Sequence, residues 1–371
     1  MTEREKTRAE APIGAVDVSV HRVPTDGPES DGTLEWDSTT VLLVRAEAGG
    51  VRGLGYSYTD EAAGMLVRDA LAAVVRGRDA MAVPGSWETM WHAVRNLGRS
   101  GVVSSAIAAV DVALWDLKAR LLDLPLVALL GEVRDAVDAY GSGGFTSYTI
   151  PKLQAQLGGW VEAGIPRVKM KIGRDPDADA ARVAAAREAI GPAADLYVDA
   201  NGAYRRKQAL ALAQTFRHES AVSWFEEPVP ADDLEGLRLL RDRAPAGMAI
   251  AVGEYGYRLD DFRAYLAGGA ADVLQADATR CGGITGFLRV GGLCDAFHVP
   301  LSAHTAPSLH AHPCCALPAA LNVEYFYDHA RIEHLFFDGA LTPVDGKLRP
   351  DRSRPGLGLE LREEEAARYA I

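Results

Sequence analysis

Three acidic residues, Asp199, Glu226 and Glu254, each end a short apolar run, and nearly equal gaps separate them along the chain. The runs are 196–199, 222–226 and 250–254. Each run has the length and composition of a buried strand, so each acid falls where a strand would meet a loop. In a parallel barrel the carboxyl ends of all strands lie on one face, and acids on consecutive strands are then neighbours in space. An all-oxygen site of this kind suits Mg²⁺, which keeps positions open for water or substrate oxygens.

The same period of strand and gap continues on both sides of these acids. Upstream, one run holds Lys169 and Lys171, which point to the same face because they are two residues apart. Downstream, three further runs end in Asp277, His304 and Glu324. The runs that complete the set are 137–141, 167–171, 272–277, 299–304 and 321–324. Eight strands in this order predict an α/β fold built on a (β/α)8 barrel of the TIM type.

The pattern as a whole resembles the enolase superfamily, in its mandelate racemase subgroup. The resemblance rests on the Lys-x-Lys strand, on Val-Asp-Ala-Asn at 198–201, on Phe-Glu-Glu-Pro at 225–228, on the Gly253-Glu254 end, and on the separated Asp277 and His304. Each piece is common alone, but their order and spacing extend over most of the chain. The resemblance implies a modified barrel, (β/α)7β, preceded by an α+β capping domain.

The resemblance also implies roles for individual residues. Lys171 is implied as a general base, and Lys169 as the contact of the substrate carboxylate. His304, backed by Asp277, is implied to face Lys171 across the substrate. Glu324 is implied to hydrogen-bond the enediolate oxygen opposite the metal, which requires its protonated form for part of the time. Abstraction of a proton by a Lys or His base, with Mg²⁺ stabilising an enediolate, is the chemistry of this superfamily.

Simple electrostatics gives two of these pairs a physical reason. The Lys169 cation and the metal both disfavour protonated Lys171, which is expected to move its pKa towards working pH. A carboxylate at Asp277 that accepts from one ring nitrogen of His304 fixes the tautomer and raises the basicity of the other nitrogen. Acids after strands also cap helices, but that explanation covers one such acid more easily than three.

Two polar residues beside the metal acids are expected to lie behind them. Glu227 points the opposite way from Glu226 on a strand. Asn201 follows Asp199 at the same strand end. We therefore expect Asn201 and Glu227 to support the metal ligands without binding the metal.

At 371 residues the chain is longer than one barrel of about 250 residues, which predicts a second domain. Alternating runs at 16–24, 39–48 and 53–58 predict an antiparallel sheet, and helical periodicity follows at 62–75, 87–95 and 102–122. Between 24 and 35 the sequence predicts a polar loop, which the resemblance implies would close over the barrel mouth, and beyond Glu324 the strand and helix period is lost. The resemblance implies a capping domain at 1–130 that is completed by the tail at 341–371, and we expect a catalytic barrel at 131–340.

Composition limits the partners. The formal charge is −12 and no basic run occurs, which argues against nucleic-acid binding. The polar segment 1–12 lacks the apolar stretch of a secretory signal, and no run has membrane-spanning length, so we expect a cytoplasmic protein without membrane contact. The expected partner is a small-molecule carboxylate, and the resemblance implies a homo-oligomer.

A group of histidines and cysteines at 310–315 resembles a soft-metal cluster. It lacks the Cys-x-x-Cys or spaced His pair of zinc sites, so we expect packing there and not a metal. The four cysteines are Cys281, Cys294, Cys314 and Cys315. The last two are adjacent and rarely bridge each other, so reduced thiols are expected.

The predicted activity is Mg²⁺-dependent abstraction of the proton α to a carboxylate. Dehydration of a sugar acid to a 2-keto-3-deoxy acid is the leading prediction, and racemisation or epimerisation of a 2-hydroxy acid is the alternative. A cycloisomerase of the muconate-lactonising type is disfavoured, because no lysine lies between Asp277 and Arg289 to act as a second base lysine. A barrel without catalytic activity has no support, because every acid and base position is filled.

Overall fold

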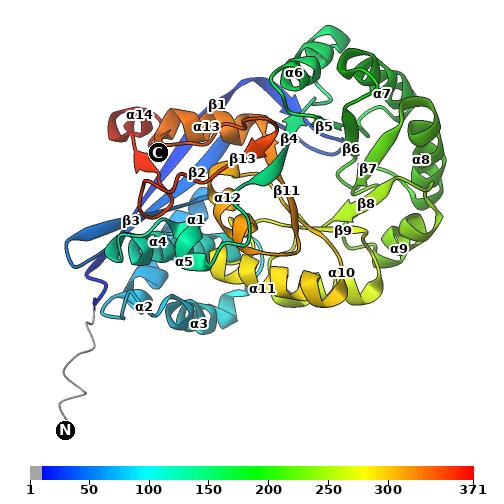
Figure 1. Ribbon diagram of the computed structural model, residues 1–371. Coiled ribbons are helices and arrows are strands. Elements are labelled where there is room, and N and C mark those ends of the chain that lie inside the picture. Colours follow the sequence, from blue (N-terminus) through cyan, green and yellow to red (C-terminus); the bar gives the residue numbers. More distant parts are fainter. Residues whose placement is uncertain (1–10) are drawn as a thin grey trace.

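The computed structural model describes residues 11–371, so the segment 1–12, on which the expected absence of a secretory signal rests, lies almost wholly outside the described residues. The chain forms two parts that lie side by side (Figure 1). A sheet and its helices make the first part, and a closed barrel makes the second. The predicted fold class is confirmed.

The first part is built on a three-stranded antiparallel sheet in the order β1-β2-β3. Its strands are β1 (Ala15–Ser30), β2 (Glu35–Ala48) and β3 (Val51–Tyr58). Helix α4 (Val102–Leu121) packs on this sheet, because Gly53 and Gly55 leave room for it. A Cβ atom on these glycines would lie 2.3 Å from the carbonyl oxygen of Ala113 and 2.2 Å from that of Ala109. The close approach of helix and sheet therefore depends on two missing side chains.

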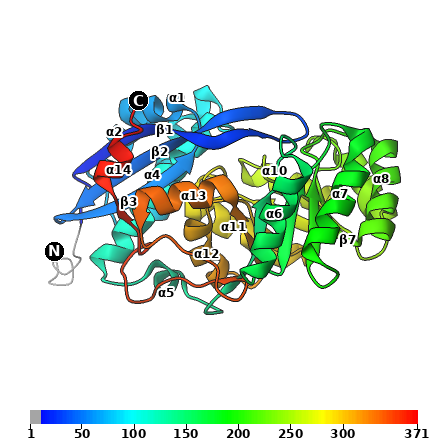
Figure 2. The same cartoon turned by 90° about the horizontal axis from the view of Figure 1, so that it is seen from above.

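The predicted polar loop between 24 and 35 is wrong, because most of it continues β1 and β2 as a two-stranded arm. After an irregularity between Pro24 and Glu29, the pairing resumes at Glu29 with Trp36 and at Ser30 with Glu35. Only a short turn remains at the tip. Figure 2 shows the arm reaching from the first part towards α6 (Ile150–Glu162). Cross-strand pairing, which a count of polar residues does not detect, keeps this segment extended.

The remaining helices of the first part are short. They are α1 (Glu61–Leu66), η2 (Val67–Leu71), α2 (Ala72–Val75), α3 (Val83–Ala93), η3 (Arg95–Leu97) and α5 (Leu126–Leu130). The predicted helix at 62–75 is thus present as three consecutive pieces. The helices predicted at 87–95 and 102–122 correspond to α3 and α4.

The second part is a closed barrel of eight parallel strands. The strands are β4 (Val137–Gly143), β5 (Arg167–Lys171), β6 (Asp195–Asp199), β7 (Val222–Glu226), β8 (Ala249–Val252), β9 (Val273–Ala276), β10 (Leu301–Ala303) and β11 (Ala320–Phe326). Pairing of β11 with β4 closes the ring. Each predicted strand is present, with ends shifted by at most a few residues.

Helices alternate with these strands and cover the barrel (Figure 1). After α6 they are α7 (Pro176–Ile190), α8 (Arg206–Ser220), α9 (Leu234–Arg243), α10 (Leu259–Gly268), α11 (Gly283–Phe297), α12 (Pro307–Ala316) and α13 (Tyr327–Phe336). The expectation that the helical period is lost after Glu324 is wrong, because α13 follows β11. This helix buries Asp328, His329 and Glu333, so polar side chains occupy positions where an apolar stripe is expected.

The tail returns to the first part of the molecule. Its elements are β12 (Phe337–Asp338), β13 (Lys347–Leu348), β14 (Glu360–Leu361) and α14 (Glu363–Ala367). The amide of Ile371 donates to the carbonyl of Val20 at 3.0 Å, and the amide of Arg22 donates to that of Tyr369 at 2.8 Å. These contacts support assigning the tail to the capping domain, whose boundaries at 130 and 341 we propose.

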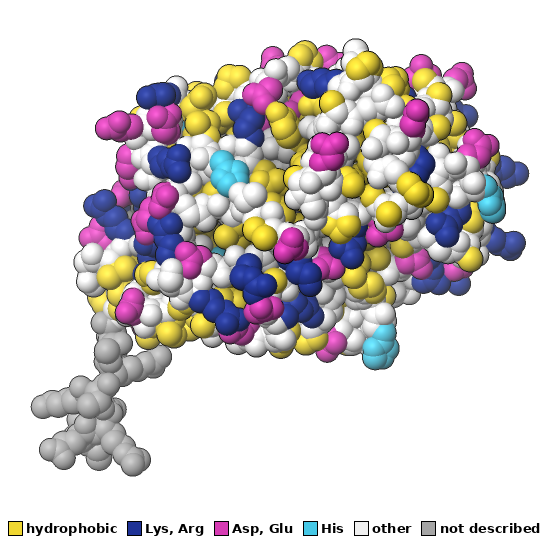
Figure 3. All heavy atoms as spheres, turned by 45° about the horizontal axis from the view of Figure 1, so that its top comes forward, with side chains coloured by type: hydrophobic (Ala, Val, Ile, Leu, Met, Phe, Trp, Pro, Cys, Tyr) yellow, Lys and Arg dark blue, Asp and Glu magenta, His cyan; other side chains and the backbone are white. Residues whose placement is uncertain are grey.

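The surface mixes charges of both signs. On the face drawn in Figure 3, acidic and basic side chains lie among each other with no field of one sign. None of the helices in residues 11–371 combines the length and the apolar character that crossing a membrane requires.

Candidate active site

The three predicted metal acids converge inside the barrel at the carboxyl ends of neighbouring strands. Asp199 ends β6, Glu226 ends β7, and Glu254 follows β8 by two residues. One carboxylate oxygen from each lies within 4.8 Å of the other two, and all three side chains are buried. Gly253 makes the last turn possible, because a Cβ atom there would lie 2.2 Å from the carbonyl oxygen of Gln275. Three buried negative charges this close repel one another unless cations face them.

Two lysines from β5 supply part of that positive charge. The Nζ atom of Lys169 lies 2.7 Å from Glu226 and 2.8 Å from Glu324, and Lys171 forms an ion pair with Asp199. Both lysines are buried. Burial acts to lower the pKa of Lys171, but the charges of Asp199, Glu254 and Glu226 together raise it above its ordinary value. The downward shift expected from the sequence depends on the charge of a bound metal and stays a prediction.

The predicted dyad of His304 and Asp277 is present. Nδ1 of His304 lies 2.9 Å from Asp277, and Nε2 lies 3.1 Å from Glu254. Thr279 donates to the other oxygen of Asp277 from both its amide and its hydroxyl, each at 2.7 Å. Asp277 thus fixes the Nδ1 edge of the ring, so that Nε2 points towards Glu254. Burial acts to lower the pKa of His304, but Glu254 and Glu324 raise it to about 9.

Glu324 lies opposite the metal acids and is fully bonded. Ser142 donates its hydroxyl at 2.5 Å, the amide of Thr305 donates at 3.1 Å, and Lys169 is its ion-pair partner. Burial acts to raise the pKa of Glu324, but Lys169 and His304 lower it to about 2. The protonated form, which the family resemblance implies for part of the time, stays a prediction for the site with metal and substrate bound.

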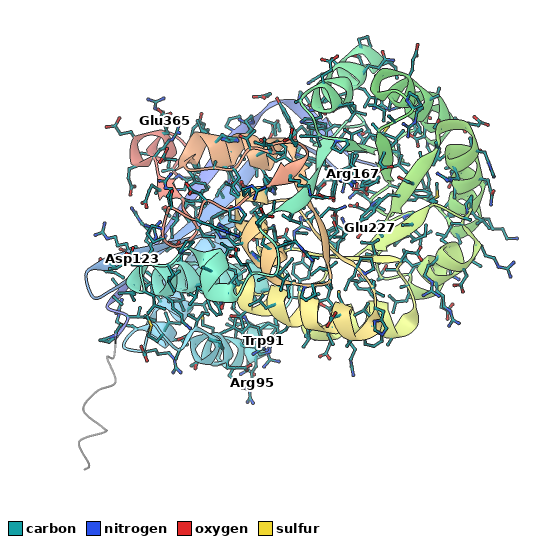
Figure 4. All side chains as sticks on the ribbon, in the orientation of Figure 1. Trp91, Arg95, Asp123, Arg167, Glu227 and Glu365 are labelled. Carbon is teal, nitrogen blue, oxygen red and sulfur yellow. The ribbon has the colours of Figure 1, made fainter. Side chains whose placement is uncertain are left out.

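Asn201 and Glu227 are buried next to the acids: the amide of Asn201 donates to Asp199 at 2.9 Å, and Glu227 directly follows Glu226. Figure 4 labels Glu227 inside the ring of barrel strands. Both residues have positive φ, 46° and 37°, where the chain turns away from β6 and β7. Oδ1 of Asn201 and Oε1 of Glu227 are buried without a hydrogen-bond partner among the described residues. Backbone strain and unpaired polar atoms gather at functional sites.

These observations fit a divalent cation. The converging ligand atoms are all carboxylate oxygens, which hard cations such as Mg²⁺ prefer. The unpaired Oδ1 of Asn201 adds an acceptor beside them. A cation here would relieve the repulsion that, with burial, raises the pKa of Glu226 to about 8.

A cavity of about 190 Å³ opens on these groups. Its lining residues are Asp31, Leu34, Trp36, Thr39, Lys171, Asn201, Glu254, Tyr255, Arg280, His304, Thr305, Phe326 and His329. Four of them come from the arm, which covers the barrel mouth with Asp31, Leu34, Trp36 and Thr39. The cavity therefore combines charged groups from barrel strand ends with side chains from a distant part of the chain.

Sequence reasoning missed several of these lining residues, among them Arg280, Trp36 and His329. Arg280 lies 3.7 Å from both Glu254 and Asp277, and its position three residues after Asp277 was the available signal. Trp36 belongs to the arm and lies one residue beyond the predicted loop at 24–35. His329 belongs to α13, where no helix was expected.

The histidine and cysteine group at 310–315 is occupied by structural bonds. Nε2 of His310 accepts from the amide of Ala278 at 2.8 Å, and Nδ1 donates to the carbonyl of Thr305 at 2.7 Å. His312 bonds the carbonyl of Leu357 at 3.1 Å. The four cysteines are buried free thiols. His310 thus helps to hold the loops behind Asp277 and His304.

Comparison with known proteins places the chain in a family. Residues 152–366 match the family described as enolase C-terminal domain-like, and residues 15–131 match the mandelate racemase/muconate lactonizing enzyme N-terminal domain. The chain belongs to this family of the enolase superfamily, as its motifs predicted. It is an enzyme of the lyase or isomerase type.

Individual relatives cover nearly the whole chain. The 3,6-anhydro-alpha-L-galactonate cycloisomerase of Streptomyces coelicolor is 32% identical, over 97% of this chain and 99% of its own. The L-talarate/galactarate dehydratase of Salmonella typhimurium is 32% identical, over 94% of this chain and 89% of its own. A mandelate racemase/muconate lactonizing enzyme-like protein from Rubrobacter xylanophilus has a crystal structure with a TM-score of 0.95 and 57% identity, covering 97% of this chain and 100% of its own.

The cofactor is magnesium. The Salmonella dehydratase was solved with Mg and L-lyxarohydroxamate, with a TM-score of 0.91 and 29% identity, covering 100% of this chain and 95% of its own. The buried acids of this chain suit the same ion. The predicted cofactor is therefore confirmed.

Proposed function

We propose that this enzyme dehydrates a sugar acid to a 2-keto-3-deoxy acid. One observation carries the proposal: Lys171 and His304, an amine and an imidazole, line one cavity above three buried carboxylates. They come from β5 and from the end of β10, which are far apart around the ring. An acid substrate between them would meet one proton-transfer group on each side.

The metal is assigned to Asp199, Glu226 and Glu254, with Asn201 and Glu227 behind them. When bound, Mg²⁺ supplies Lewis acidity that stabilises negative charge developing on the substrate carboxylate. Lys169, buried among Glu226, Glu324 and Asp199, adds a fixed positive charge to the same region.

Lys171 in its neutral form takes the proton from the α-carbon, and the electron pair of that C–H bond moves into the carboxylate to give an enediolate. Glu324 lies on the opposite side, held by Ser142 and Thr305, and in its protonated form it donates a hydrogen bond to the enediolate oxygen. Collapse of the enediolate then breaks the bond between C3 and its oxygen. Nε2 of His304 gives its proton to that oxygen, so water leaves and an enol remains, which becomes the 2-keto acid.

The dyad geometry supports this role for His304. Asp277 occupies Nδ1 at 2.9 Å, which leaves Nε2 as the atom that exchanges a proton with substrate. Relatives named for dehydration of L-talarate or galactarate, of L-rhamnonate and of arabinonate support a sugar acid as the substrate class.

Isomerisation is the second candidate, favoured by the cycloisomerase named above. If the oxygen on C3 belongs to a ring, the same proton removal and bond cleavage open that ring and release no water. This route needs no second lysine, so the missing lysine after Asp277 does not argue against it. Racemisation also uses bases on both faces: Lys171 keeps the proton it removes, and His304 delivers its own proton to the opposite face of the α-carbon.

A substrate screen tests the proposal. Monoacid and diacid sugars, together with anhydro sugar acids, are incubated with enzyme and Mg²⁺, and 2-keto acids are detected with semicarbazide. Dehydration predicts a keto acid from an open-chain acid. Turnover of anhydro acids alone would replace it with ring-opening isomerisation, and α-proton exchange without any keto acid would indicate a racemase.

A further inference from the structure

His329 is a buried histidine that the chemistry proposed above does not use. It lies in the first turns of α13, has an exposed fraction of 8%, and lines the same cavity as Lys171 and His304. Its position at the cavity wall calls for an account of what its ring binds.

The ring is held rigidly on two sides. It stacks on Tyr58 with centroids 3.4 Å apart and planes 13° apart, and it meets Phe326 edge to face at 5.1 Å. The hydroxyl of Tyr58 also donates to the carbonyl of His329 at 3.3 Å. Because Tyr58 belongs to β3 of the capping sheet, both parts of the molecule fix the orientation of this ring.

The polar atoms of the ring lack partners. Nδ1 is enclosed and makes no hydrogen bond to any described residue, and no hydrogen bond within residues 11–371 uses the other ring nitrogen. Buried histidines elsewhere in the chain differ. His304 and His310 use ring nitrogens in protein contacts, and His312 uses one. Buried polar groups are normally paired, so an unpaired ring at a cavity points to a ligand.

The charge of the ring indicates which ligand. Burial lowers the pKa of His329 well below its ordinary value, and the nearby His304 lowers it further, so the ring is neutral. A neutral imidazole carries one N–H donor and one acceptor. Those are the complements of a hydroxyl group, whereas a carboxylate would be better served by a cation such as Arg280 in the same lining.

We propose that His329 is a specificity-determining residue whose ring hydrogen-bonds a substrate hydroxyl that the reaction does not remove. The ligand class is therefore a polyhydroxylated acid with at least one hydroxyl beyond the reacting carbons. This inference rests on the proposed function, because it assumes an acid substrate in this cavity. The inference adds a residue, His329, that recognises the part of the substrate beyond the reacting carbons.

The test compares His329→Phe with the wild-type holoenzyme on aldonic and aldaric acids and on their monodeoxy analogues, in the presence of Mg²⁺. Phenylalanine keeps the stacking on Tyr58 and removes both nitrogens. For the parent acid, we expect kcat/KM to fall about 10- to 100-fold, mostly through KM, since an unmade hydrogen bond removes binding common to ground and transition states. For the one analogue that lacks the recognised hydroxyl, wild type and His329→Phe should have the same kcat/KM.

Two further variants keep the test decisive. His329→Gln retains a donor and an acceptor and should recover part of the lost affinity, while Tyr58→Phe, which keeps the ring stack, should resemble wild type. Circular dichroism checks that each variant folds. Equal discrimination among all analogues by wild type and His329→Phe would overturn the inference.

A failure of the proposed function looks different. In that case wild type would make no keto acid from any acid, and calorimetric binding of the same acids would replace turnover as the readout. A difference between wild type and His329→Phe that vanishes on one deoxy analogue would still support the hydroxyl contact. Identical affinities throughout would reject it.

Discussion

Inside the barrel an aromatic layer and a charged layer lie two residues apart along the same strands. On β6 Tyr197 precedes Asp199, and on β7 Trp224 precedes Glu226. Tyr197 and Trp224 stack with centroids 5.0 Å apart, and Tyr140 of β4 meets Tyr197 at 5.4 Å. Residues two apart on a strand share a face, so both layers fill the same interior at different heights.

The two layers are in contact but have different roles. The indole of Trp224 donates to Glu226 at 3.0 Å, and the ammonium of Lys169 lies 5.4 Å from the ring centroid of Tyr140. The aromatic layer forms a buried cluster that stabilises the fold through packing. The charged layer gathers carboxylates whose repulsion only opposite charges offset. The comparison indicates that residues for stability and residues for catalysis occupy successive layers along the same barrel strands. They are not divided between the two domains.

The strongest perturbation is removal of either proton-transfer group in the charged layer. Lys171→Ala and His304→Asn should each lower kcat by about 10² to 10⁴-fold, the usual contribution of general acid–base catalysis. Each variant should still exchange the α-proton of one stereoisomer with deuterium, because the other base remains. Proton NMR in D₂O measures this exchange. Exchange of the same stereoisomer by both variants at the wild-type rate would contradict the roles.

Damage to the aromatic layer should affect stability instead. Tyr197→Ala leaves a cavity beside Trp224 and should lower the free energy of unfolding by about 3–5 kcal/mol, as for other large aromatic truncations. Urea unfolding measures this loss. The folded fraction should keep kcat within a few-fold of wild type. If Tyr197→Ala has the wild-type free energy of unfolding but has lost activity, the assignment of stability to the aromatic layer and catalysis to the charged layer is wrong.

Metal affinity gives the next effect. Glu226→Gln removes one charged ligand and should weaken Mg²⁺ binding by at least about 100-fold, more than is typical for residues behind a metal ligand. Cys314→Ala, a buried control outside the charged layer, should leave affinity unchanged. Titration calorimetry compares the two. Unchanged Mg²⁺ affinity in the Glu226 variant would remove this residue from the metal site.

The smallest effect concerns Glu29 in the arm, whose carboxylate accepts from the indole of Trp36 at 2.9 Å. Burial and the charge of Asp328 raise the pKa of Glu29 to about 8, whereas its ordinary value is 4.5. Its contribution to stability is therefore complete below about pH 4.5 and is lost as pH rises through 8. Between pH 5 and 9 the free energy of unfolding should fall by at least about 1 kcal/mol more in wild type than in Glu29→Gln, since a shift of one pKa unit corresponds to about 1.4 kcal/mol. Parallel pH profiles of the two proteins in urea unfolding would count against this.

The charged layer was largely predictable from the sequence because strand ends are local signals. Apolar runs ending in Asp199, Glu226 and His304 identify strands, and parallel topology then brings their ends together. The convergence of acids, lysines and the dyad follows from that topology without knowledge of any side-chain contact.

The covering side of the cavity could not be predicted in the same way. Trp36 reaches it only because β1 and β2 pair beyond Pro24, and His329 reaches it only because α13 buries polar side chains. Both positions depend on contacts distant in sequence.

The most direct test of the proposed reaction is proton NMR of a sugar acid with enzyme and Mg²⁺ in D₂O. Loss of a β-hydroxyl needs an acid beside the departing oxygen, and Nε2 of His304, with Asp277 behind the ring, is placed for that. We expect a 2-keto-3-deoxy acid to accumulate, with no epimer of the starting acid. Deuterium at C2 of both epimers, with no keto acid, would contradict dehydration and establish racemisation.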